Sequence, residues 1–331
     1  MGKIDVLVLS GNEIERLGLG MADCIRIVEE TLREQAQGNV TVAHTPALHV
    51  GKGLSKLYLH AMPAYVGKPE AAGIKWVSYF PENQKVGLPD STGIVILNDP
   101  RNGIPQCIME GMRVTYARTA ALTAVAAKYL ARQDSETVGI VGAGALARAS
   151  VIALKEVLPA VRIVKAVSRR ESSRKAFCDT MRRLVDYEII PVTTAQEAVE
   201  DADVIVSAPS VVTEPLIKNE WFKRGALATP LKGGSEFDME SLVSADKFLV
   251  EHWPSFRTKN ENLDAIGLKL YGELGEVVCG KKPGRETDEE RIISINGGVG
   301  TTDLTIGIEL YRRALDRGIG TKLSLFQPTR T

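Results

Sequence analysis

The sequence predicts an α/β protein in which a doubly wound parallel sheet forms one domain and an α+β arrangement forms a second. The length of 331 residues fits about two domains of roughly 150 residues each. Short apolar strands alternate with helices from Val138 to Ser207, which is typical of βαβ units and a parallel sheet. A glycine-rich turn at 142–144 lies between the first of these strands and the helix that follows it.

The composition is that of an ordinary globular protein. Hydrophobic residues make up 44% and charged residues 25% of the chain, which excludes a disordered protein. Lys and Arg together number 41, as do Asp and Glu, so the formal net charge is zero. A balanced charge argues against a general nucleic-acid binder and against a polybasic protein of the membrane surface.

Membrane, secretion and metal signals are weak. No apolar run approaches the ~18 residues of a membrane span, and the short apolar run after Asp5 does not fit a signal peptide. The cysteines Cys24, Cys107, Cys178 and Cys279 are far apart and form no CxxC pair. They therefore predict no metal site, and we expect reduced thiols in a cytoplasmic protein.

The first part of the chain mixes strands with helices. Residues 4–9 predict a strand, and apolar residues recur at helical spacing from Met21 to Gln35. Residues 55–95 carry short strand-like runs separated by turns that contain proline and glycine. The alanine-rich stretch 115–131 predicts a helix.

The middle of the chain, from about residue 118 to about residue 300, has the alternation of a doubly wound domain. The last predicted helix, 303–317, is expected to pack outside that domain. The strands predicted for the domain are 138–141, 163–167, 189–193 and 203–207, and the helices are 145–157, 171–185 and 195–201.

The motif Gly142-Ala143-Gly144-Ala145-Leu146-Ala147 joins the first strand of this domain to its first helix. Gly142 allows a tight turn, Gly144 lets the backbone approach a pyrophosphate, and Ala147 lets the helix lie near the sheet. The free N–H groups at the start of the helix then face the anion. Because the motif follows a strand and opens a helix, it predicts dinucleotide binding rather than a glycine-rich turn without a ligand.

The end of the second strand predicts which dinucleotide binds. Sites that prefer NAD place Asp or Glu there to hold the ribose 2′-hydroxyl. Here the sequence is Val167-Ser168-Arg169-Arg170, with no acid before Glu171. Ser168 can hydrogen-bond a 2′-phosphate and the arginines can pair with it, which favours NADP(H) over NAD(H). The alternative is that both arginines are solvated residues that open a helix.

A bound nicotinamide implies hydride transfer, for which the protein supplies orientation and charge. Lys75 is a cation in an apolar strand, and Arg118 is a planar cation among small residues, suited to a carboxylate. Spacing alone leaves open a solvent-facing lysine and an ordinary salt bridge. His44 and His49 are candidates for a pocket lining, although such residues are more often surface or core histidines.

A series of short motifs runs through nearly the whole chain. They are Gly73-Ile74-Lys75-Trp76-Val77, Gly87-Leu88-Pro89, Ile96-Leu97-Asn98, Arg118-Thr119, residues 126–131, Gly142-Ala143-Gly144, residues 272–278 and Asn296-Gly297-Gly298-Val299-Gly300. In order and spacing these motifs resemble the ornithine cyclodeaminase/μ-crystallin family.

The resemblance implies a protomer of two domains and a homodimer. A substrate-binding and dimerisation domain would comprise residues 1–117 and 303–331, and a Rossmann dinucleotide-binding domain would comprise residues 118–302. Lys75 and Arg118 would face the substrate, with Arg118 on its α-carboxylate.

Further contacts follow from the same resemblance. Thr119 would approach the cofactor, and Gly298 and Val299 would lie near the nicotinamide and the substrate. We also expect cofactor contacts from Ser207-Ala208-Pro209 and from Leu231.

The sequence departs from the family pattern in two places. Cyclodeaminases of the family carry an Asp, which handles the substrate amine, in the loop before a Glu-Leu-Asp motif. Here Glu236-Phe237-Asp238 matches that motif, but the loop has Lys232 and no Asp. The stretch 42–50, where the family often has Arg or Lys, has only His44 and His49. A charge ~4 Å away is worth about 4 kcal/mol at an effective dielectric constant of about 20, so the first change disfavours a diamine substrate.

We therefore predict an NADPH-dependent oxidoreductase that reduces an α-imino acid, of the ketimine reductase or amino-acid dehydrogenase type. Lys75 and Arg118 are the predicted catalytic residues. Lys232 and His44 are further candidates for contact with the small amino- or imino-acid substrate, and Lys232 would bind an acidic side chain. Two alternatives remain: a cyclodeaminase that releases ammonia from ornithine or lysine, and a μ-crystallin-like protein that binds a small ligand together with NADPH.

Overall fold

The structure is a computed structural model that describes residues 4–43, 47–50, 57–258, 260, 263 and 266–326. The chain divides into two compact units: residues 1–118 with 299–331, and residues 119–298. The division falls one residue after the first boundary expected from the sequence and four residues before the second. Arg118 and residues 299–302 therefore lie in the first unit.

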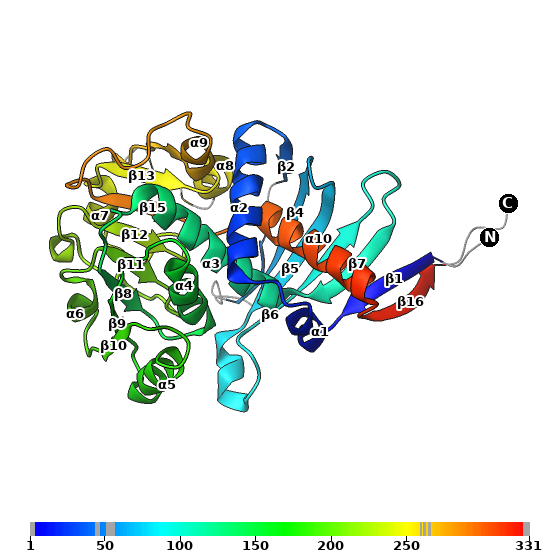
Figure 1. The fold of residues 1–331 in the computed structure, drawn as a ribbon, viewed down its shortest axis with the longest axis horizontal. Helices are drawn as coiled ribbons and strands as arrows, with labels where there is room; N and C mark the ends of the chain where they lie inside the picture. Colours follow the sequence, from blue (N-terminus) through cyan, green and yellow to red (C-terminus); the bar gives the residue numbers. More distant parts are fainter. Residues whose placement is uncertain are drawn as a thin grey trace. The chain divides into compact units, whose positions relative to one another are not determined.

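The first unit is built on a mixed sheet with the strand order β16-β1-β7-β6-β5-β4-β2, in which β3 also pairs with β4 (Figure 1). Its strands are β1 (Ile4–Leu9), β2 (Val40–Val42), β3 (Ala47–His49), β4 (Tyr58–Val66), β5 (Ala71–Tyr79), β6 (Ser91–Asn98), β7 (Pro105–Glu110) and β16 (Thr321–Phe326). Its helices are α1 (Gly11–Arg16), α2 (Met21–Ala36), the 3-10 helix η1 (Pro81–Val86), α10 (Gly300–Arg317) and the first part of α3 (Gly111–Leu130).

The two faces of this sheet differ in burial. Register pairs Lys75 of β5 with Met62 of β4 and Val95 of β6, and all three side chains are at most 4% exposed. The next residues along the strands point to the other face, where Trp76 and Ile94 pair and are exposed. The alternation of the strand therefore buries Lys75 on the face that α10 covers.

Helix α10 approaches this face closely at its first residue. A Cβ atom at Gly300 would lie 2.4 Å from the carbonyl oxygen of Met62, so no larger residue fits. The helix begins there, three residues before the start that the sequence predicts, with Val299 as its N-cap residue. The extra turn places Asp303 inside the helix rather than at its end.

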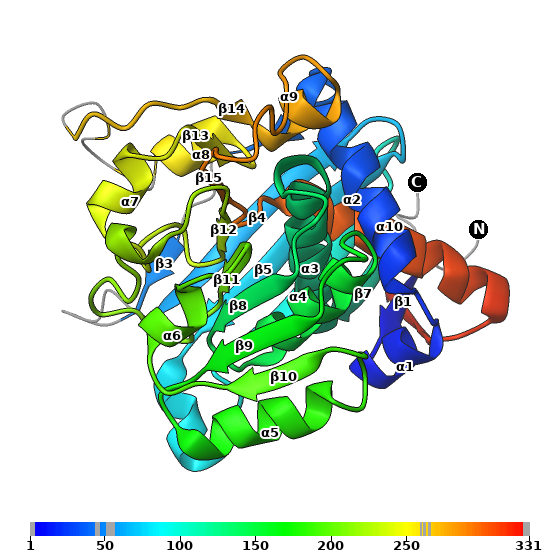
Figure 2. The ribbon, with the colours of Figure 1, turned by 60° about the vertical axis from the view of Figure 1, so that its left-hand side comes forward.

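The second unit is a parallel sheet with the order β10-β9-β8-β11-β12-β15-β13-β14 (Figure 2). Its strands are β8 (Thr137–Val141), β9 (Ile163–Val167), β10 (Glu188–Pro191), β11 (Val204–Ser207), β12 (Leu227–Pro230), β13 (Lys247–Val250), β14 (Gly272–Glu273) and β15 (Ile292–Ile295). Its helices are α4 (Ala145–Lys155), α5 (Glu171–Met181), α6 (Ala195–Val199), α7 (Met239–Val243), α8 (Trp253–Arg257), α9 (Leu274–Val278) and the 3-10 helix η2 (Asn219–Trp221).

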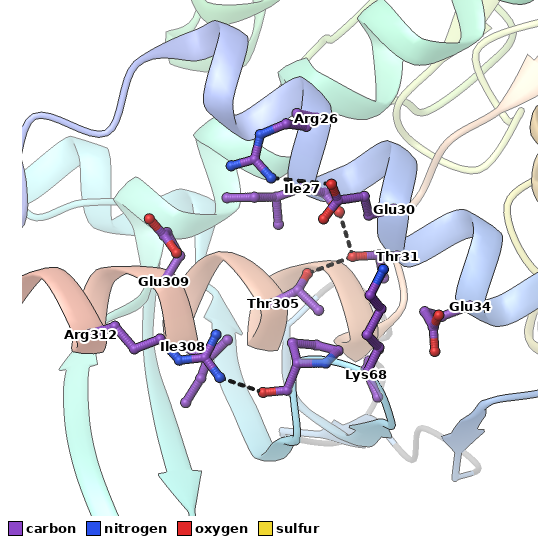
Figure 3. Close-up of a pocket in the computed structure, with 12 residues that line it drawn as sticks. Arg26, Ile27, Glu30, Thr31, Glu34, Lys68, Thr305, Ile308, Glu309 and Arg312 are labelled. Carbon is purple, nitrogen blue, oxygen red and sulfur yellow. Dashed lines mark hydrogen bonds and ion pairs between the residues drawn. The ribbon is translucent and has the colours of Figure 1, made fainter.

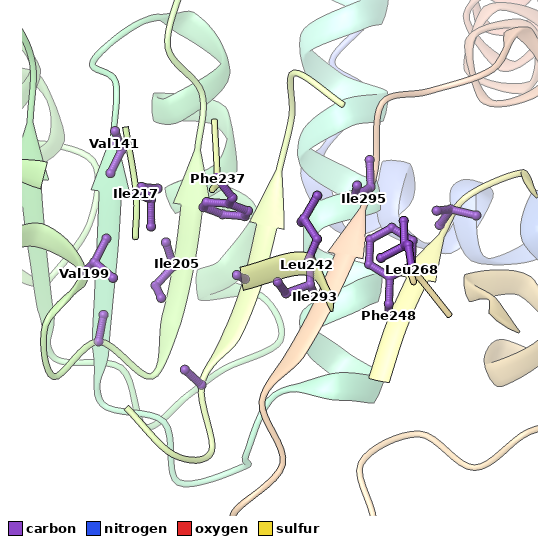
Figure 4. Close-up of a cluster of buried hydrophobic side chains, with 14 of the residues drawn as sticks. Val141, Val199, Ile205, Ile217, Phe237, Leu242, Phe248, Leu268, Ile293 and Ile295 are labelled. Carbon is purple, nitrogen blue, oxygen red and sulfur yellow. The ribbon is translucent and has the colours of Figure 1, made fainter. Parts of the chain in front are cut away.

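This order confirms the predicted doubly wound fold. The chain runs outward from β8 through β9 to β10 and then returns to β11 on the other side of β8. Ligands of such sheets bind where the strand order reverses, at the carboxyl ends of the strands. One face of the sheet is covered by an apolar cluster that includes Ile205, Phe237, Phe248 and Ile293 (Figure 4).

At the opposite, amino end of the strands, Asp203 ties β8 to β11. Its Oδ2 accepts hydrogen bonds from the backbone N–H groups of Glu136 and Thr137, at 2.8 and 2.9 Å. Its Oδ1 lies 2.6 Å from the ammonium of Lys223. Burial raises the pKa of Asp203, but the Lys223 ammonium and the two N–H donors outweigh it, so the pKa lies below its ordinary value.

We expect Asp203→Asn to lower the free energy of unfolding by about 2 kcal/mol near neutral pH, because the amide keeps the shape but not the charge. The stabilisation is present above the pKa of an unfolded Asp, about 3.9, and is lost as the pH falls through the lower folded value. Urea unfolding should therefore show the gap between wild type and variant narrowing as the pH falls below about 3.9. The exposed neighbour substitution Asp201→Asn is the control, and a gap that persists in acid would contradict the charge-based account.

Candidate active site

Three charged side chains are buried together in the first unit. Lys75 lies in β5, Arg118 in α3 and Asp303 in the first turns of α10, and they are 1%, 4% and 0% exposed. Lys75 Nζ lies 2.6 Å from Asp303 Oδ2, and Arg118 Nε lies 3.2 Å from Asp303 Oδ1. Each oxygen of the carboxylate therefore holds one cation.

The charges of this cluster leave room for an anion. A buried charge is costly unless it is paired, and here two cations share one carboxylate, which leaves a formal excess of one positive charge. Arg118 Nη1 is buried and has no hydrogen-bond partner among the described residues. A guanidinium edge that is buried and unsatisfied can take up a ligand carboxylate.

The cluster bears on the alternatives that the sequence left open. Lys75 is buried and not solvent-facing, whereas Arg118 does form a salt bridge, and its Nη1 has no hydrogen-bond partner among the described residues. Asp303 was not predicted as a site residue, because an acid in the first turn of a helix is ordinarily explained by the helix dipole. Its position after the glycine-rich motif 296–300 and among apolar helix positions is the only signal in the sequence.

The glycine-rich turn of the second unit brings three strand ends together. Gly142 has a φ of 111°, and a Cβ atom on it would lie 2.4 Å from the Ala208 carbonyl oxygen, so only glycine fits. Its N–H donates to the carbonyl oxygen of Val167 at the end of β9. The Ala208 N–H donates to Val141 at the end of β8.

The start of α4 fits the phosphates of a dinucleotide. Ala143 and Gly144 precede the helix, and Ala145 and Leu146 are its first two residues. Gly144 is the N-cap residue, and no side chain caps the helix. A Cβ atom on Gly144 would meet no protein atom within 4 Å. Open space beside uncapped N–H groups at the reversal of strand order is the arrangement that binds a pyrophosphate.

Several predicted cofactor residues surround this strand edge. Ser207 ends β11, and its buried hydroxyl has no partner among the described residues. Ala208 and Pro209 follow it and are buried, and the N–H of buried Leu231, which follows β12, donates to the Ser207 carbonyl oxygen. Asn296, which the sequence analysis did not select, follows β15 with its amide nitrogen buried and unpartnered in the described part of the chain.

The basic residues after β9 are free to bind. Ser168 is half-buried, and Arg169 and Arg170 are exposed. Neither arginine forms an ion pair with another described residue, and Arg170 is the N-cap residue of α5. This position is compatible with a clamp on a 2′-phosphate and with solvated residues at a helix start.

The remaining predicted residues lie as follows. Thr119, in α3, is buried, and its hydroxyl has no partner among the residues described. Gly298 has a φ of 87° and ends the second unit, and Val299 is buried at the start of α10. Lys232 is half-buried after β12, where its N–H and that of Gly234 donate to the Glu236 carboxylate. His44 lies outside the described residues, and His49 is exposed in β3.

Burial has clear effects on titratable groups away from the buried cluster. Burial raises the pKa of Glu236, although the N–H groups of its own loop and Lys232 oppose the shift. The four cysteines are free thiols, and burial raises the pKa of both Cys24 and Cys107 to about 12. These two thiols are therefore poor nucleophiles.

A pocket of about 230 Å³ lies elsewhere in the first unit, between α2, α10 and the turn after β4 (Figure 3). Inside it Thr31 donates a hydrogen bond of 2.9 Å to Thr305. At its edge Arg26 pairs with Glu30, and Arg312 donates to the carbonyl oxygen of Pro69. None of the predicted catalytic residues lines it.

The described residues contain neither a metal-binding cluster nor a membrane-spanning helix. No group of three or more His, Cys, Asp or Glu side chains there is placed to hold a metal ion. No helix in the same part of the chain has the length and apolar character needed to cross a membrane.

Comparison with known proteins gives relatives that span the chain. The alanine dehydrogenase of Archaeoglobus fulgidus is 32% identical over 335 residues, covering 98% of this chain and 100% of the relative. The structure of Thermococcus litoralis Δ1-pyrroline-2-carboxylate reductase in complex with NADH and L-proline is 32% identical, with a TM-score of 0.89 over 96% of this chain and all of that one. An archaeal alanine dehydrogenase dimer with bound NAD is 30% identical, with a TM-score of 0.86 over 98% and 100%.

These relatives are, by name, a dehydrogenase and a reductase with nicotinamide cofactors, which is the enzyme class that the sequence predicts. The family model for the ornithine cyclodeaminase/mu-crystallin family matches residues 5–318. The motifs, the fold and this match agree, and the chain belongs to the ornithine cyclodeaminase/mu-crystallin family.

Proposed function

We propose that this protein is an NADPH-dependent oxidoreductase that reduces an α-imino acid to the amino acid. The observation that carries the proposal is the buried cluster in which Lys75 and Arg118 share the carboxylate of Asp303. Its excess of one positive charge and the free Arg118 Nη1 suit a ligand with one carboxylate. The named activities of the 30–32% identical relatives, on alanine and on a cyclic imino acid, support the same substrate class.

A nicotinamide dinucleotide bound to the second unit would supply the hydride. Gly142, Gly144 and the uncapped start of α4 would hold its pyrophosphate, and the unpartnered Ser207 hydroxyl offers a further hydrogen bond. Arg169 and Arg170 would hold a 2′-phosphate. The two solved relatives hold NADH and NAD, so the preference for NADP(H) rests on this chain's own residues after β9: the basic pair, Ser168 and the lack of an acid there.

In the first unit, Arg118 would bind the substrate carboxylate through the guanidinium edge that Asp303 does not use. This fixes the position of the α-carbon, which lies one bond from the carboxylate. Lys75 would donate a proton to the imine nitrogen and a hydride would then add to the imine carbon, so that the C=N bond becomes a C–N bond with one new hydrogen on each atom. Full burial of the Lys75 side chain keeps bulk water from competing for that proton.

A homodimer through the first unit is part of the proposal. Trp76 and Ile94 share the sheet face opposite α10, and Leu48 and Tyr65 lie on that same face by register. All four are exposed large hydrophobic residues, and an exposed apolar sheet face supports a subunit interface. The cytoplasmic location stays a proposal that the four free thiols support.

The carboxylate role of Arg118 predicts a specific kinetic defect. Wild type is expected to oxidise NADPH with at least one member of a panel of cyclic imino acids and of α-keto acids with ammonia or methylamine. For that substrate Arg118→Ala should raise KM on the order of 100-fold, because a buried charge-assisted contact is lost. Cofactor affinity, followed by NADPH fluorescence, should stay unchanged.

Lys128→Ala, on the exposed part of the same helix, is the matched control. An unchanged KM in Arg118→Ala would remove its assigned role. If wild type reduces nothing in the panel but releases ammonia from ornithine with NADP⁺, the protein is a cyclodeaminase instead.

The two glycines of the phosphate loop should differ in effect. Gly142→Ala should destabilise the fold by about 2 kcal/mol, since its φ is positive and a Cβ would meet Ala208. Gly144→Ala should leave thermal stability unchanged, because its φ is ordinary and its Cβ would enter open space. That same Cβ should weaken dinucleotide binding at least ~10-fold. Unaltered binding by a stable Gly144→Ala would place the pyrophosphate elsewhere.

The basic pair predicts the cofactor preference. Removing both side chains, Arg169→Ala with Arg170→Ala, should raise KM for NADPH on the order of 10- to 100-fold and leave KM for NADH unchanged. Lys175→Ala removes an exposed cation from the next turn of α5 and serves as the control. A wild type that prefers NADH, or a variant whose NADPH-to-NADH ratio does not move, would show that the arginines are solvated residues.

A further inference from the structure

Asp303 is completely buried, and each of its carboxylate oxygens contacts a cation. Its carboxylate oxygens are used by Lys75 Nζ at 2.6 Å and Arg118 Nε at 3.2 Å. Buried ion pairs are often no more stabilising than an apolar core of the same volume, so stability gives little reason to bury three ionisable groups. A role toward a ligand gives a stronger reason.

The charge count of the cluster gives that explanation. Without Asp303, the cluster would carry two positive charges, and a substrate carboxylate would neutralise only one of them. A substrate or product nitrogen that is cationic while Lys75 is protonated would then lie beside an uncompensated charge. At an effective dielectric constant of about 20, a like charge ~4 Å away costs about 4 kcal/mol. The negative charge of Asp303 offsets this repulsion.

We propose that Asp303 is a positioning residue that sets Lys75 and Arg118 and supplies the counter-charge for a protonated substrate nitrogen. The ligand class is a zwitterion with one carboxylate and one cationic nitrogen, the iminium of an α-imino acid. The inference rests on the proposed function and deepens it. It also explains why Arg118 offers its Nη edge, since Asp303 occupies Nε.

The step balances in atoms and charge. An N–H bond of the Lys75 ammonium breaks and its electron pair stays on lysine, while the imine lone pair forms the new N–H bond. The positive charge moves from Lys75 to the substrate nitrogen, and the negative charge of Asp303 remains beside both. A hydride supplied by the dinucleotide would then reduce the iminium carbon, and Lys75 would regain a proton after the product has left.

Two ligands of the same size separate this role from a structural one. L-Proline has a cationic nitrogen and one carboxylate, and pyrrole-2-carboxylate has a ring nitrogen that carries no charge and the same carboxylate. Asp303→Asn should weaken L-proline binding relative to pyrrole-2-carboxylate on the order of 10- to 100-fold, measured by calorimetry on the NADP⁺-loaded protein. Pyrrole-2-carboxylate itself should bind as tightly as in wild type or more tightly, because the cluster then carries two positive charges.

Kinetics give a second readout. With Δ1-pyrroline-2-carboxylate and NADPH, Asp303→Asn should lower kcat on the order of 100-fold, more than it raises KM. Thr305→Val is the matched control, since Thr305 is buried two residues further along α10. Among the described residues its side chain bonds only within that helix and to Thr31 (Figure 3). This control should leave the binding ratio and kcat unchanged.

A second variant changes the charge of the cluster in the opposite direction, and it allows the test if Asp303→Asn does not fold. Lys75→Met removes a cation and leaves the Asp303 charge, so it should strengthen L-proline relative to pyrrole-2-carboxylate. Equal weakening of both ligands in Asp303→Asn, or an unmoved ratio in Lys75→Met, would overturn the inference. Either result can occur while wild type still reduces imines, whereas a wild type that reduces none would defeat the proposed function itself.

Discussion

The first unit depends on one arrangement of charges, in which a carboxylate with no exposure to solvent holds two cations from different elements. Lys75 enters from a strand, Arg118 from a helix that follows the sheet, and Asp303 from the last helix. None of the three could be buried alone, because an isolated ion in the interior is strongly unfavourable. The packing of α10 on the sheet and the pairing of the three buried charges therefore depend on each other.

The close approach of α10 to the sheet makes this pairing of charges possible. Gly300 lets the first turn of the helix lie on β4, and this depth puts Asp303 at the level of Lys75. A larger residue at position 300 would lift the helix from the sheet. The second unit shows the same logic at Gly142, where a positive φ and a crowded Cβ position join three strand ends into one edge. In both units a single glycine determines how closely two backbone segments approach. That distance in turn determines where the functional groups of the site lie.

The sequence predicted correctly those parts of the fold that depend on local backbone pattern. Strand β1 and strand β9 have the predicted bounds, and the motif after β8 predicts its turn and helix, because local periodicity and glycine chemistry determine these elements. The short strands β12, β13 and β15 were not predicted, since they are buried on both faces and show no alternation, and β14 has only two residues. Lys75 and Arg118 were predicted as candidate site residues. Their burial and ion pairing were not predicted, because burial depends on which element covers them.

The role of Asp303 could not be predicted from the sequence. Its partners are 228 and 185 residues away, so no local pattern can reveal them. The same separation has a consequence for synthesis of the protein. The second unit is one continuous segment and is complete once residue 298 leaves the ribosome, whereas the first unit waits for α10 and for β16 to pair with β1. During translation the strands of the first unit must therefore stay without their covering helix while the second unit folds, and this interval is when a nascent chain has most need of a chaperone.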